Sequence, residues 1–261
     1  MISVREAAEQ LAAAGVPSAV NDARLLLQHA SATGSDVSDL LARRAARVPL
    51  QHIVGSTGFR YLELMVGPGV FVPRPESELL VDAVLAAIAP AGSPRVVDLC
   101  AGSGAIGLSV AHEHPTVEVD LVEASAAAVE WLRRNAAGRS RVTIHHADLA
   151  AAPTGSDGMI DVVVSNPPYV ATHERAQVDP EVRDHDPDVA LWAGDDGLDV
   201  IRLVADRAKV LLRPGGSLVV EHSDRQGESV PSLFAAAGFD DVADHLDLTG
   251  RPRFTTAVWR G

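Results

Sequence analysis

The sequence predicts an α/β fold, with a doubly wound, mostly parallel seven-stranded sheet that follows a small N-terminal helical domain and a β-hairpin linker. Two observations predict this fold. From residue 95 onward, short β-branched runs alternate with segments of helical periodicity, whereas residues 1–55 show helical periodicity alone. A chain of 261 residues, 47% of them hydrophobic, can bury one sizeable core and a smaller additional domain.

The N-terminal helical domain is expected over residues 1–55. Small and apolar residues recur at helical spacing from Val4 to Ala12, and the Gly-Val-Pro that follows ends this helix. Ser18 or Asn21 could cap a second helix, and residues 36–47 offer a third. A unit of this size is marginal on its own, so we expect it to pack against the rest of the chain.

The linker is expected over residues 56–73. Apolar positions alternate over 59–72, and the Gly67–Gly69 segment, Gly-Pro-Gly, supplies a turn, which together predict a β-hairpin. We place the hinge between the two domains in this hairpin. The third unit, residues 74–261, then begins with a helix over 76–88.

Strands and helices alternate through the rest of the third unit, as expected for a doubly wound sheet. The predicted strands cover residues 96–99, 117–122, 142–145, 159–165, 217–221 and 254–259. The predicted helices cover residues 105–112, 125–137, 198–212 and 227–237. A Pro-Gly-Gly at 214–216 stops the third of these helices, and the last two strands could pair antiparallel.

A glycine-rich loop follows the first strand of the sheet. Gly102 and Gly104 let the backbone approach a ligand closely, and the helix behind them offers unpaired N–H groups. Glu123 ends the next strand, where an acid can accept hydrogen bonds from ribose hydroxyls. Asp148 follows the third strand and could receive an adenine amine. Sheets of this kind bind ligands at these carboxyl ends, near the topological switch point.

Two ligands compete for this loop. Gly102-x-Gly104-x-x-Gly107, followed by Glu123, satisfies the dinucleotide fingerprint of a dehydrogenase. Asp98, however, precedes the first of these glycines and would crowd a pyrophosphate with negative charge. The same carboxylate suits S-adenosylmethionine, which carries an ammonium and a sulfonium group. We therefore favour S-adenosylmethionine over a dinucleotide.

The motif Asn-Pro-Pro-Tyr at residues 166–169 ends the strand predicted over 159–165. Neither proline has a backbone N–H and both fix φ, so the carbonyls of Asn166 and Pro167 lie in a stiff loop without local competition. With the side-chain carbonyl of Asn166 and the ring of Tyr169, they form a receptor for a planar –NH₂ group, either a carboxamide or an exocyclic base amine. Hydrogen bonds from both of its hydrogens favour the charge that this nitrogen develops as it attacks. A strand-ending turn is the simpler alternative.

With both motifs, the chain resembles the HemK/PrmC family of release factor glutamine N5-methyltransferases, which are class I, Rossmann-like, S-adenosylmethionine-dependent enzymes. The resemblance extends over most of the chain and includes residues 47–55, 67–78, 181–197 and 247–254. It implies transfer of the cofactor's methyl group to the side-chain amide of a glutamine, with S-adenosylhomocysteine as the product. The substrate would be the Gly-Gly-Gln loop of peptide chain release factors, gripped in part by the N-terminal domain.

The residues expected to contact the cofactor are Asp98, Cys100, Ala101, Gly102, Ser103, Gly104, Glu123, Asp148, Leu149 and Asn166. The glutamine would be held by Asn166, Pro167, Pro168 and Tyr169, of which Asn166, Pro167 and Tyr169 are the expected catalytic residues. The family usually has Gly and Thr at the positions of Cys100 and Ala101, a change that the loop absorbs if Cys100 has φ < 0. Leu149 stands where an aromatic residue can pack on adenine, and the N-terminal domain is shorter than usual.

The net charge and the aromatic content of the chain disfavour one class of binding partner, nucleic acids. A formal net charge of −13 and an aromatic content of 4% disfavour a nucleic-acid adenine-N6 methyltransferase, which uses the same amine chemistry but needs a basic face and stacking rings. A different glutamine-bearing protein substrate and a binding module without turnover also stay open. The acidic stretch 174–188 is most simply a solvated loop, and alternatively a lid or rim that meets a basic partner.

The remaining features fit a cytoplasmic enzyme without a metal or a membrane anchor. No apolar run reaches the roughly 18 residues that a membrane span needs, and the N-terminus from Met1 to Glu6 lacks the pattern of a signal peptide. The single cysteine, Cys100, fits a reducing compartment. The histidine pairs at 112/114 and 145/146 lack the spacing of metal ligands.

Overall fold

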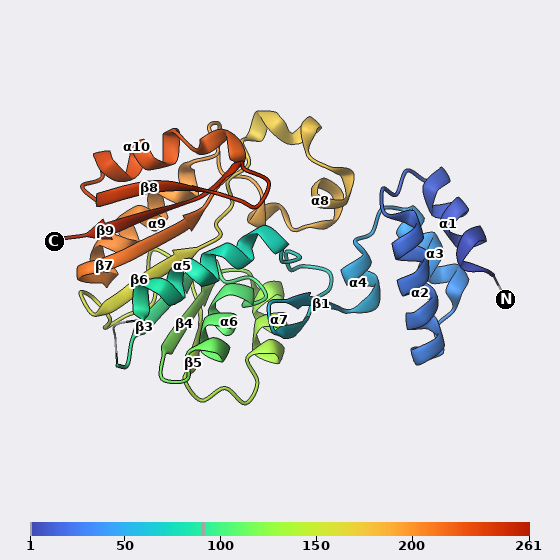
Figure 1. Ribbon diagram of the computed structural model, residues 1–261, viewed down its shortest axis with the longest axis horizontal. Coiled ribbons are helices and arrows are strands. Elements are labelled where there is room, and N and C mark those ends of the chain that lie inside the picture. Colours follow the sequence, from blue (N-terminus) through green and yellow to red (C-terminus); the bar gives the residue numbers. More distant parts are fainter. Residues whose placement is uncertain (1, 90–91) are drawn as a thin grey trace.

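A computed structural model describes residues 2–89 and 92–261 (Figure 1). Met1, with which the predicted N-terminal domain begins, and residues 90–91 of the predicted third unit lie outside the described residues. The N-terminal helices form one end of the molecule, and the sheet with its covering helices forms the rest (Figure 1).

The N-terminal helices are α1 Val4–Ala13, α2 Ala19–Thr33, α3 Val37–Ala45 and α4 Leu50–Val54. A capping box starts α1, because the Ser3 side chain accepts from the Glu6 N–H while the Glu6 carboxylate accepts from the Ser3 N–H. The Asp36 side chain caps α3, and Gly34 ends α2 at a φ of 75°. The helices bury an apolar cluster of their own that includes Leu11 and Leu26. The three predicted helices are confirmed, and α4 was not predicted.

The predicted hairpin exists, but its turn was misplaced. Strands β1 Ser56–Phe59 and β2 Leu62–Met65 pair antiparallel around a turn at residues 60–61, not at Gly67–Gly69. A turn does form at Gly67–Val70, where the Val70 N–H donates to the Gly67 carbonyl over 3.3 Å and Gly69 has a φ of 89°, but it follows β2 and does not join the two strands. The same glycines also allow close packing. A Cβ on Gly67 would lie 2.4 Å from the Trp131 ring, and one on Gly69 would lie 2.8 Å from the Cβ of Ala127. The Gly-Pro-Gly segment is therefore required both by this turn and by contact with the helix that carries these two residues.

The main sheet has seven strands, in the order β5-β4-β3-β6-β7-β9-β8. In chain order they are β3 Arg95–Leu99, β4 Glu118–Glu123, β5 Val142–His146, β6 Ile160–Ser165, β7 Leu212–Glu221, β8 Asp240–Leu246 and β9 Pro252–Trp259. The first five are parallel, and β9 pairs antiparallel with both β7 and β8, so the predicted antiparallel pair is confirmed. Strand β8 was not predicted, because its acidic residues lower its strand propensity; such residues are tolerated at a sheet edge.

Helices cover both faces of the sheet. They are α5 Glu78–Ile88, α6 Ala105–Glu113, α7 Ala126–Asn135, α9 Asp199–Leu211 and α10 Ser229–Ala236. Neighbouring residues of one strand enter opposite cores: Val96 packs with α5 and α6, whereas Val97 packs with α9 and α10. Burial on both faces explains why the predicted strands are continuous apolar runs.

The switch in strand order brings the two sequence motifs together. Strand β3 pairs in parallel with β6, with Leu99 opposite Ser165, so the glycine loop and the Asn-Pro-Pro-Tyr loop leave the sheet side by side. The Ser165 hydroxyl donates a hydrogen bond to the Leu99 carbonyl over 2.6 Å. A crevice at this position is the usual ligand site of an open α/β sheet.

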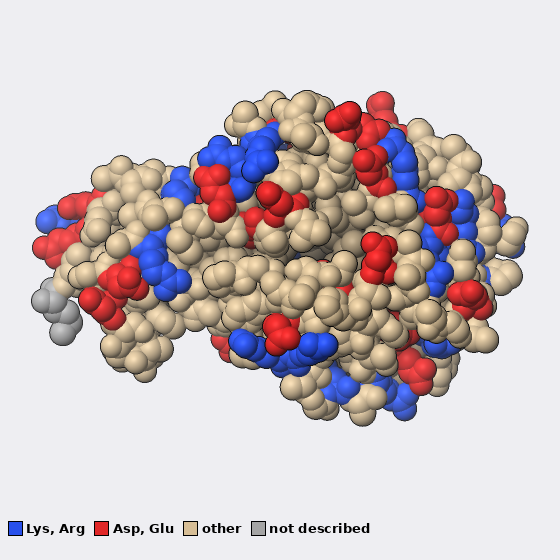
Figure 2. All heavy atoms as spheres, turned by 180° about the vertical axis from the view of Figure 1, so that it is seen from behind, with Lys and Arg blue, Asp and Glu red and all other residues tan. Residues whose placement is uncertain are grey.

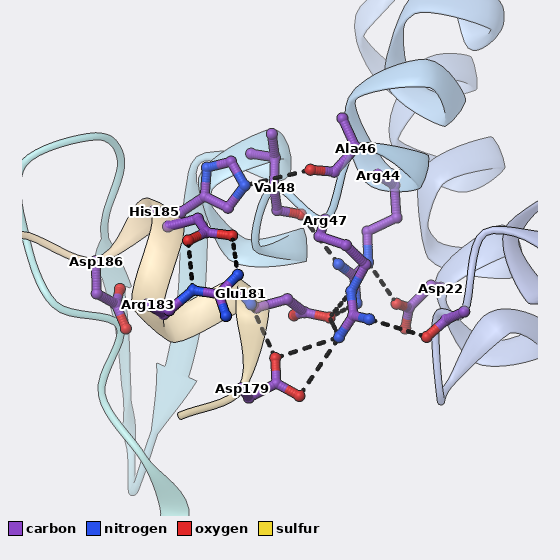
Figure 3. A network of polar contacts seen from close by, with 12 residues as sticks. Asp22, Arg44, Ala46, Arg47, Val48, Asp179, Glu181, Arg183, His185 and Asp186 are labelled. Carbon is purple, nitrogen blue, oxygen red and sulfur yellow. Dashed lines mark hydrogen bonds and ion pairs between the residues drawn. The ribbon is translucent and has the colours of Figure 1, made fainter. Parts of the chain in front are cut away.

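The acidic stretch 174–188 is not a simple solvated loop. It contains α8 Pro180–His185, between the short helical turns η2 Thr172–Gln177 and η3 Asp188–Ala190. Arg44 and Arg47 of the N-terminal helices both point at Glu181 of α8 (Figure 3), with N···O distances of 2.7 and 2.9 Å. Arg47 also pairs with Asp179, so two acids of this stretch bind arginines from residues 1–55 of the same chain, and the expectation of a simple solvated loop was wrong.

Candidate active site

A cavity of about 360 Å³ lies at the carboxyl ends of β3, β4 and β6. Its walls come from the glycine loop, the ends of these strands, the Pro-Arg-Pro segment before α5 and the chain around α8. Of the predicted site residues, those that line it are Asp98, Cys100, Ala101, Gly102, Ser103, Glu123, Asp148, Leu149, Asn166, Pro168 and Tyr169. Two segments from opposite sides of the strand-order switch thus share one cavity.

Gly104 and Pro167 are not among the residues that line the cavity. Gly104 has a φ of 86°, and a Cβ there would lie 2.6 Å from Leu132 and 2.8 Å from Leu108. Its missing side chain is therefore required for the turn into α6 and for packing against α7. Pro167 is buried.

The glycine loop makes a strained entry to α6. Cys100 has a φ of +63°, so the condition under which the loop would absorb a cysteine without strain, a negative φ, is not met. A non-glycine residue in this left-handed region costs about 1–2 kcal/mol, which explains why glycine is the natural occupant of this position. Burial raises the pKa of the Cys100 thiol, which is therefore neutral.

Asp98 has one free oxygen. The residue is 1% exposed, its Oδ2 accepts from the Gly107 N–H over 2.9 Å, and its Oδ1 has no partner among residues 2–89 and 92–261. Burial raises the pKa of this carboxyl to about 7, although the Gly107 hydrogen bond opposes the shift. An unpaired carboxylate oxygen beside a cavity fits a ligand cation, such as the ammonium of S-adenosylmethionine.

Glu123 and Asp148 are held by backbone amides. The Glu123 carboxylate accepts from the Gly102 N–H over 2.8 Å and from the Ser125 N–H over 2.7 Å. One of the amides predicted to be open for a ligand is thus occupied, but each carboxylate oxygen keeps lone pairs for hydroxyl donors. Asp148 is exposed and accepts from the Ala150 N–H, whereas Leu149 is buried in the cavity wall.

The Asn166 amide is anchored through its nitrogen. Its Nδ2 donates to the Ser77 hydroxyl over 3.1 Å, which leaves the side-chain carbonyl as its free end. The loop behind it is tied down as well, since the Gln226 amide donates to the backbone carbonyl of Tyr169 over 3.2 Å. Burial raises the pKa of the Tyr169 hydroxyl, which is therefore neutral.

Two residues next to this site, Ser77 and Glu221, were not predicted from the sequence. The Ser77 hydroxyl donates to the Glu221 carboxylate over 2.6 Å, and both side chains are buried. Burial raises the pKa of Glu221 to about 7. One signal was available: an acid follows the apolar run 218–220 at the carboxyl end of β7, as Glu123 does at the end of β4.

Arg74 connects this cavity with the end of α8. It lines the cavity, its guanidinium lies 4.8 Å from the centre of the Phe71 ring, and it pairs with Asp186 over 2.8 Å. Burial raises the pKa of Asp186 to about 6, against the effect of Arg74. The Pro-Arg-Pro segment thus forms a wall between the cofactor side and the acidic stretch.

Neither a metal-ligand cluster nor a membrane-spanning helix occurs in the described ranges. Within residues 2–89 and 92–261, no group of three or more His, Cys, Asp or Glu side chains is placed to hold a metal ion. No described helix is both long and apolar enough to cross a bilayer.

Comparisons with known proteins identify relatives of this chain. The "Methyltransferase small domain" family matches residues 62–182. The chain is 48% identical to the release factor glutamine methyltransferase of Streptomyces coelicolor, over 98% of its own length and 97% of that protein. It is 44% identical to the Mycolicibacterium smegmatis protein of the same name, over 98% and 96% of the two lengths.

A solved structure shares the fold. The Thermus thermophilus 16S rRNA N2 G1207 methyltransferase RsmC, in complex with AdoMet and guanosine, superposes with a TM-score of 0.55 at 25% identity. The match covers 78% of this chain and 50% of RsmC. From the full-length similarity to its curated relatives, the chain belongs to the release factor glutamine methyltransferase family.

Proposed function

We propose that this chain transfers the methyl group of S-adenosylmethionine to the side-chain amide nitrogen, N5, of the glutamine in the Gly-Gly-Gln loop of peptide chain release factors. One observation carries the proposal: Asp98, whose carboxylate has a buried, unpaired oxygen, and Asn166, whose amide is anchored through its nitrogen, line the same cavity. The first suits the ammonium of the cofactor, and the second presents an acceptor to an incoming amide.

The cavity residues fit the cofactor chemically. Asp98 would pair with its ammonium, Glu123 would accept from the ribose hydroxyls, Asp148 would accept from the adenine amine, and Leu149 would form the wall beside the base. S-adenosylmethionine supplies an electrophilic methyl group on a sulfonium. No metal has a role in this scheme.

The chain's contribution to the chemistry is positioning. The Asn166 Oδ1 and the Pro167 carbonyl would accept from the two hydrogens of the substrate –NH₂, and the Tyr169 ring would pack on the amide plane. An amide nitrogen is a weak nucleophile, so its alignment with the methyl group is the main catalytic effect, for which effective molarities of about 10⁵ M or more are known. No strong base is needed, because the proton can leave after the C–N bond forms.

Three units would share this work: the helical domain 1–55, the hairpin linker 56–73 and the methyltransferase domain 74–261. The first would grip the release factor, which places the reaction in the cytoplasm with translation termination. Charge supports a protein partner over a nucleic acid, since acidic and basic side chains are interspersed on the face seen in Figure 2 and the net charge is −13. The alternatives are methylation of a glutamine in another protein and adenine-N6 methylation of a nucleic acid.

The test uses purified protein, methyl-labelled S-adenosylmethionine and unmethylated release factor, either wild type or with Gln→Ala in the Gly-Gly-Gln loop. Label should enter the wild-type factor alone. Labelling of both factors, or of added DNA or RNA instead, would reject the proposed substrate, and absence of cofactor binding would restore the dinucleotide interpretation.

Asn166→Ala should lower turnover by at least about 10²-fold, the scale for one preorganised polar contact, while cofactor affinity stays within a few-fold. Ser232→Ala is the control, because Ser232 is exposed on α10, outside both the cavity and residues 1–55, and its hydroxyl donates to the Glu228 carbonyl. Normal turnover by Asn166→Ala would refute the mechanism.

A further inference from the structure

Three polar side chains from separate segments connect the sheet interior to the cavity. Glu221 ends β7, Ser77 lies in the helical turn η1 (Pro75–Ser77), and Asn166 follows β6. Glu221 and Ser77 are 1% and 3% exposed. Ser77 and Asn166 line the cavity, whereas Glu221 lies behind them.

The hydrogen positions in the hydrogen-bonded series Glu221–Ser77–Asn166 can be assigned by elimination. An ionised carboxylate only accepts hydrogen bonds, so the one hydroxyl hydrogen of Ser77 goes to Glu221, over 2.6 Å. The Ser77 oxygen can then only accept, and it does so from Asn166, over 3.1 Å. A side-chain amide has a donor end and an acceptor end that a rotation exchanges. Here the nitrogen end is fixed toward Ser77 and the oxygen end is left for a substrate.

We propose that Ser77 and Glu221 are positioning residues for methyl transfer: together they hold the Asn166 side chain with its carbonyl oxygen toward the substrate amide. This role rests on the proposed function, since it acts only through Asn166. Ser77 also transmits the negative charge of Glu221 to the Asn166 amide, which makes Oδ1 a stronger acceptor through a polarised hydrogen-bond chain.

Protonation of Glu221 should release the Asn166 amide. A neutral carboxyl can donate to Ser77, whose own hydrogen then turns toward Asn166 and favours the rotated amide with its nitrogen toward the substrate. Glu221 has a pKa raised to about 7 by burial, opposed by Ser77, Arg253 on β9 and Tyr169, and assisted by Glu76. Turnover at saturating cofactor should therefore fall as the pH drops below about 7.

A double-mutant cycle tests the coupling. Ser77→Ala should lower kcat by about tenfold, the scale of one net hydrogen bond, with cofactor affinity within about twofold. In an Asn166→Ala background the same change should have no further effect, because the residue it positions is gone. Ser77→Thr keeps the hydroxyl and should restore kcat. Ser109→Ala, which removes a buried hydroxyl that has no partner in the described ranges and does not line the cavity, should match wild type.

Glu221→Gln removes the charge of this side chain but keeps its shape. Its amide oxygen can still accept from Ser77, so kcat at pH 8 should stay within a few-fold of wild type, and the loss below pH 7 should disappear. Asp98 titrates in the same range but acts on cofactor binding, so these profiles are recorded at saturating cofactor. Additive effects of Ser77→Ala and Asn166→Ala, or a pH profile unchanged by Glu221→Gln, would overturn the proposal and leave the proposed function intact.

A second readout needs no turnover. The side-chain amide NMR signal of Asn166, identified by its loss in Asn166→Ala, should shift between pH 6 and 8 in the wild-type protein and not in Glu221→Gln. If the enzyme does not methylate release factors, the proposed function fails, and this titration alone then decides the positioning role. A signal that does not move with pH in the wild type, or that moves equally in Glu221→Gln, would reject it.

Discussion

Replacing Arg44 by Met should strongly destabilise the protein. Arg44 is 3% exposed and joins the N-terminal helices to α8 (Figure 3). Its guanidinium donates to Asp22 and to Glu181, each over 2.7 Å, and to the Val48 carbonyl over 3.1 Å. Methionine fills most of the same volume, so the change removes the charge and its hydrogen bonds more than the packing.

The magnitude follows from what is left behind. Asp22 is 2% exposed and would keep only the Ser18 hydroxyl, at 2.8 Å, as a side-chain partner. Removing one member of a buried ion pair costs about 3–5 kcal/mol, because the other charge stays buried and unpaired. Glu181 should suffer less, since it is partly exposed and still contacts Arg47. Such a loss is a large share of a typical folding free energy of about 5–15 kcal/mol.

Urea unfolding followed by circular dichroism measures this change. Arg24→Met, an exposed arginine on α2, should lose less than about 0.5 kcal/mol. Adding Asp22→Asn to Arg44→Met should recover part of the loss, because the stranded charge is then removed. Amide hydrogen exchange should also speed up in α8, whose Val182 lines the cavity. A loss below about 1 kcal/mol for Arg44→Met would refute the assignment of a buried ion-pair hub.

Three further predictions concern single positions. Burial raises the pKa of Asp98 to about 7 in the free protein, so pairing with the cofactor ammonium should release a proton. Cofactor affinity should therefore fall as the pH drops below about 7. Calorimetry in two buffers measures the proton release, and 5′-methylthioadenosine, which lacks the ammonium, should show none. Cys100→Gly should raise the unfolding free energy by about 1 kcal/mol, because it relieves a φ of +63°; an unchanged urea midpoint would contradict the strain. Gly67→Ala should cost about 1–3 kcal/mol through its contact with Trp131, whereas Gly58→Ala, with nothing within 4 Å of its Cβ, is the control that should stay near wild type.

Local pattern predicted those parts of the fold that burial on both sides dictates. The apolar runs that became β3 and β6 could be identified because each strand faces two helical layers. Strand β8 was not predicted, because it is an edge strand that carries acidic residues and pairs with one neighbour only. The glycines at 67 and 69 correctly predicted a turn, but local sequence could not show that this turn lies outside the hairpin or that it packs against Trp131 and Ala127.

The site residues divide in the same way, into those within contiguous sequence motifs and those that only long-range contacts bring together. The glycine loop and the Asn-Pro-Pro-Tyr motif are contiguous, so their chemistry could be proposed from residue types alone. Ser77 and Glu221 lie far apart in the sequence, and only the parallel pairing of β6 with β7 brings Glu221 beside the Asn166 loop. Cys100 shows a third limit, because a cysteine gives no sign in the sequence that its backbone adopts φ > 0.

Two of the buried acids near the cavity, Asp98 and Glu221, differ in their hydrogen-bond partners, and this difference indicates separate roles. Asp98 has an unpaired oxygen, whereas Glu221 is engaged by Ser77 inside the fold. Burial raises the pKa of both to about 7, so the free protein should lose stability as the pH rises from about 4 to 7, where the unfolded chain has already ionised. A ligand cation can relieve this loss only at Asp98, because Glu221 does not line the cavity. Asp98 is thus available to pair with a ligand cation, whereas Glu221 positions, through Ser77, the Asn166 side chain that receives the substrate.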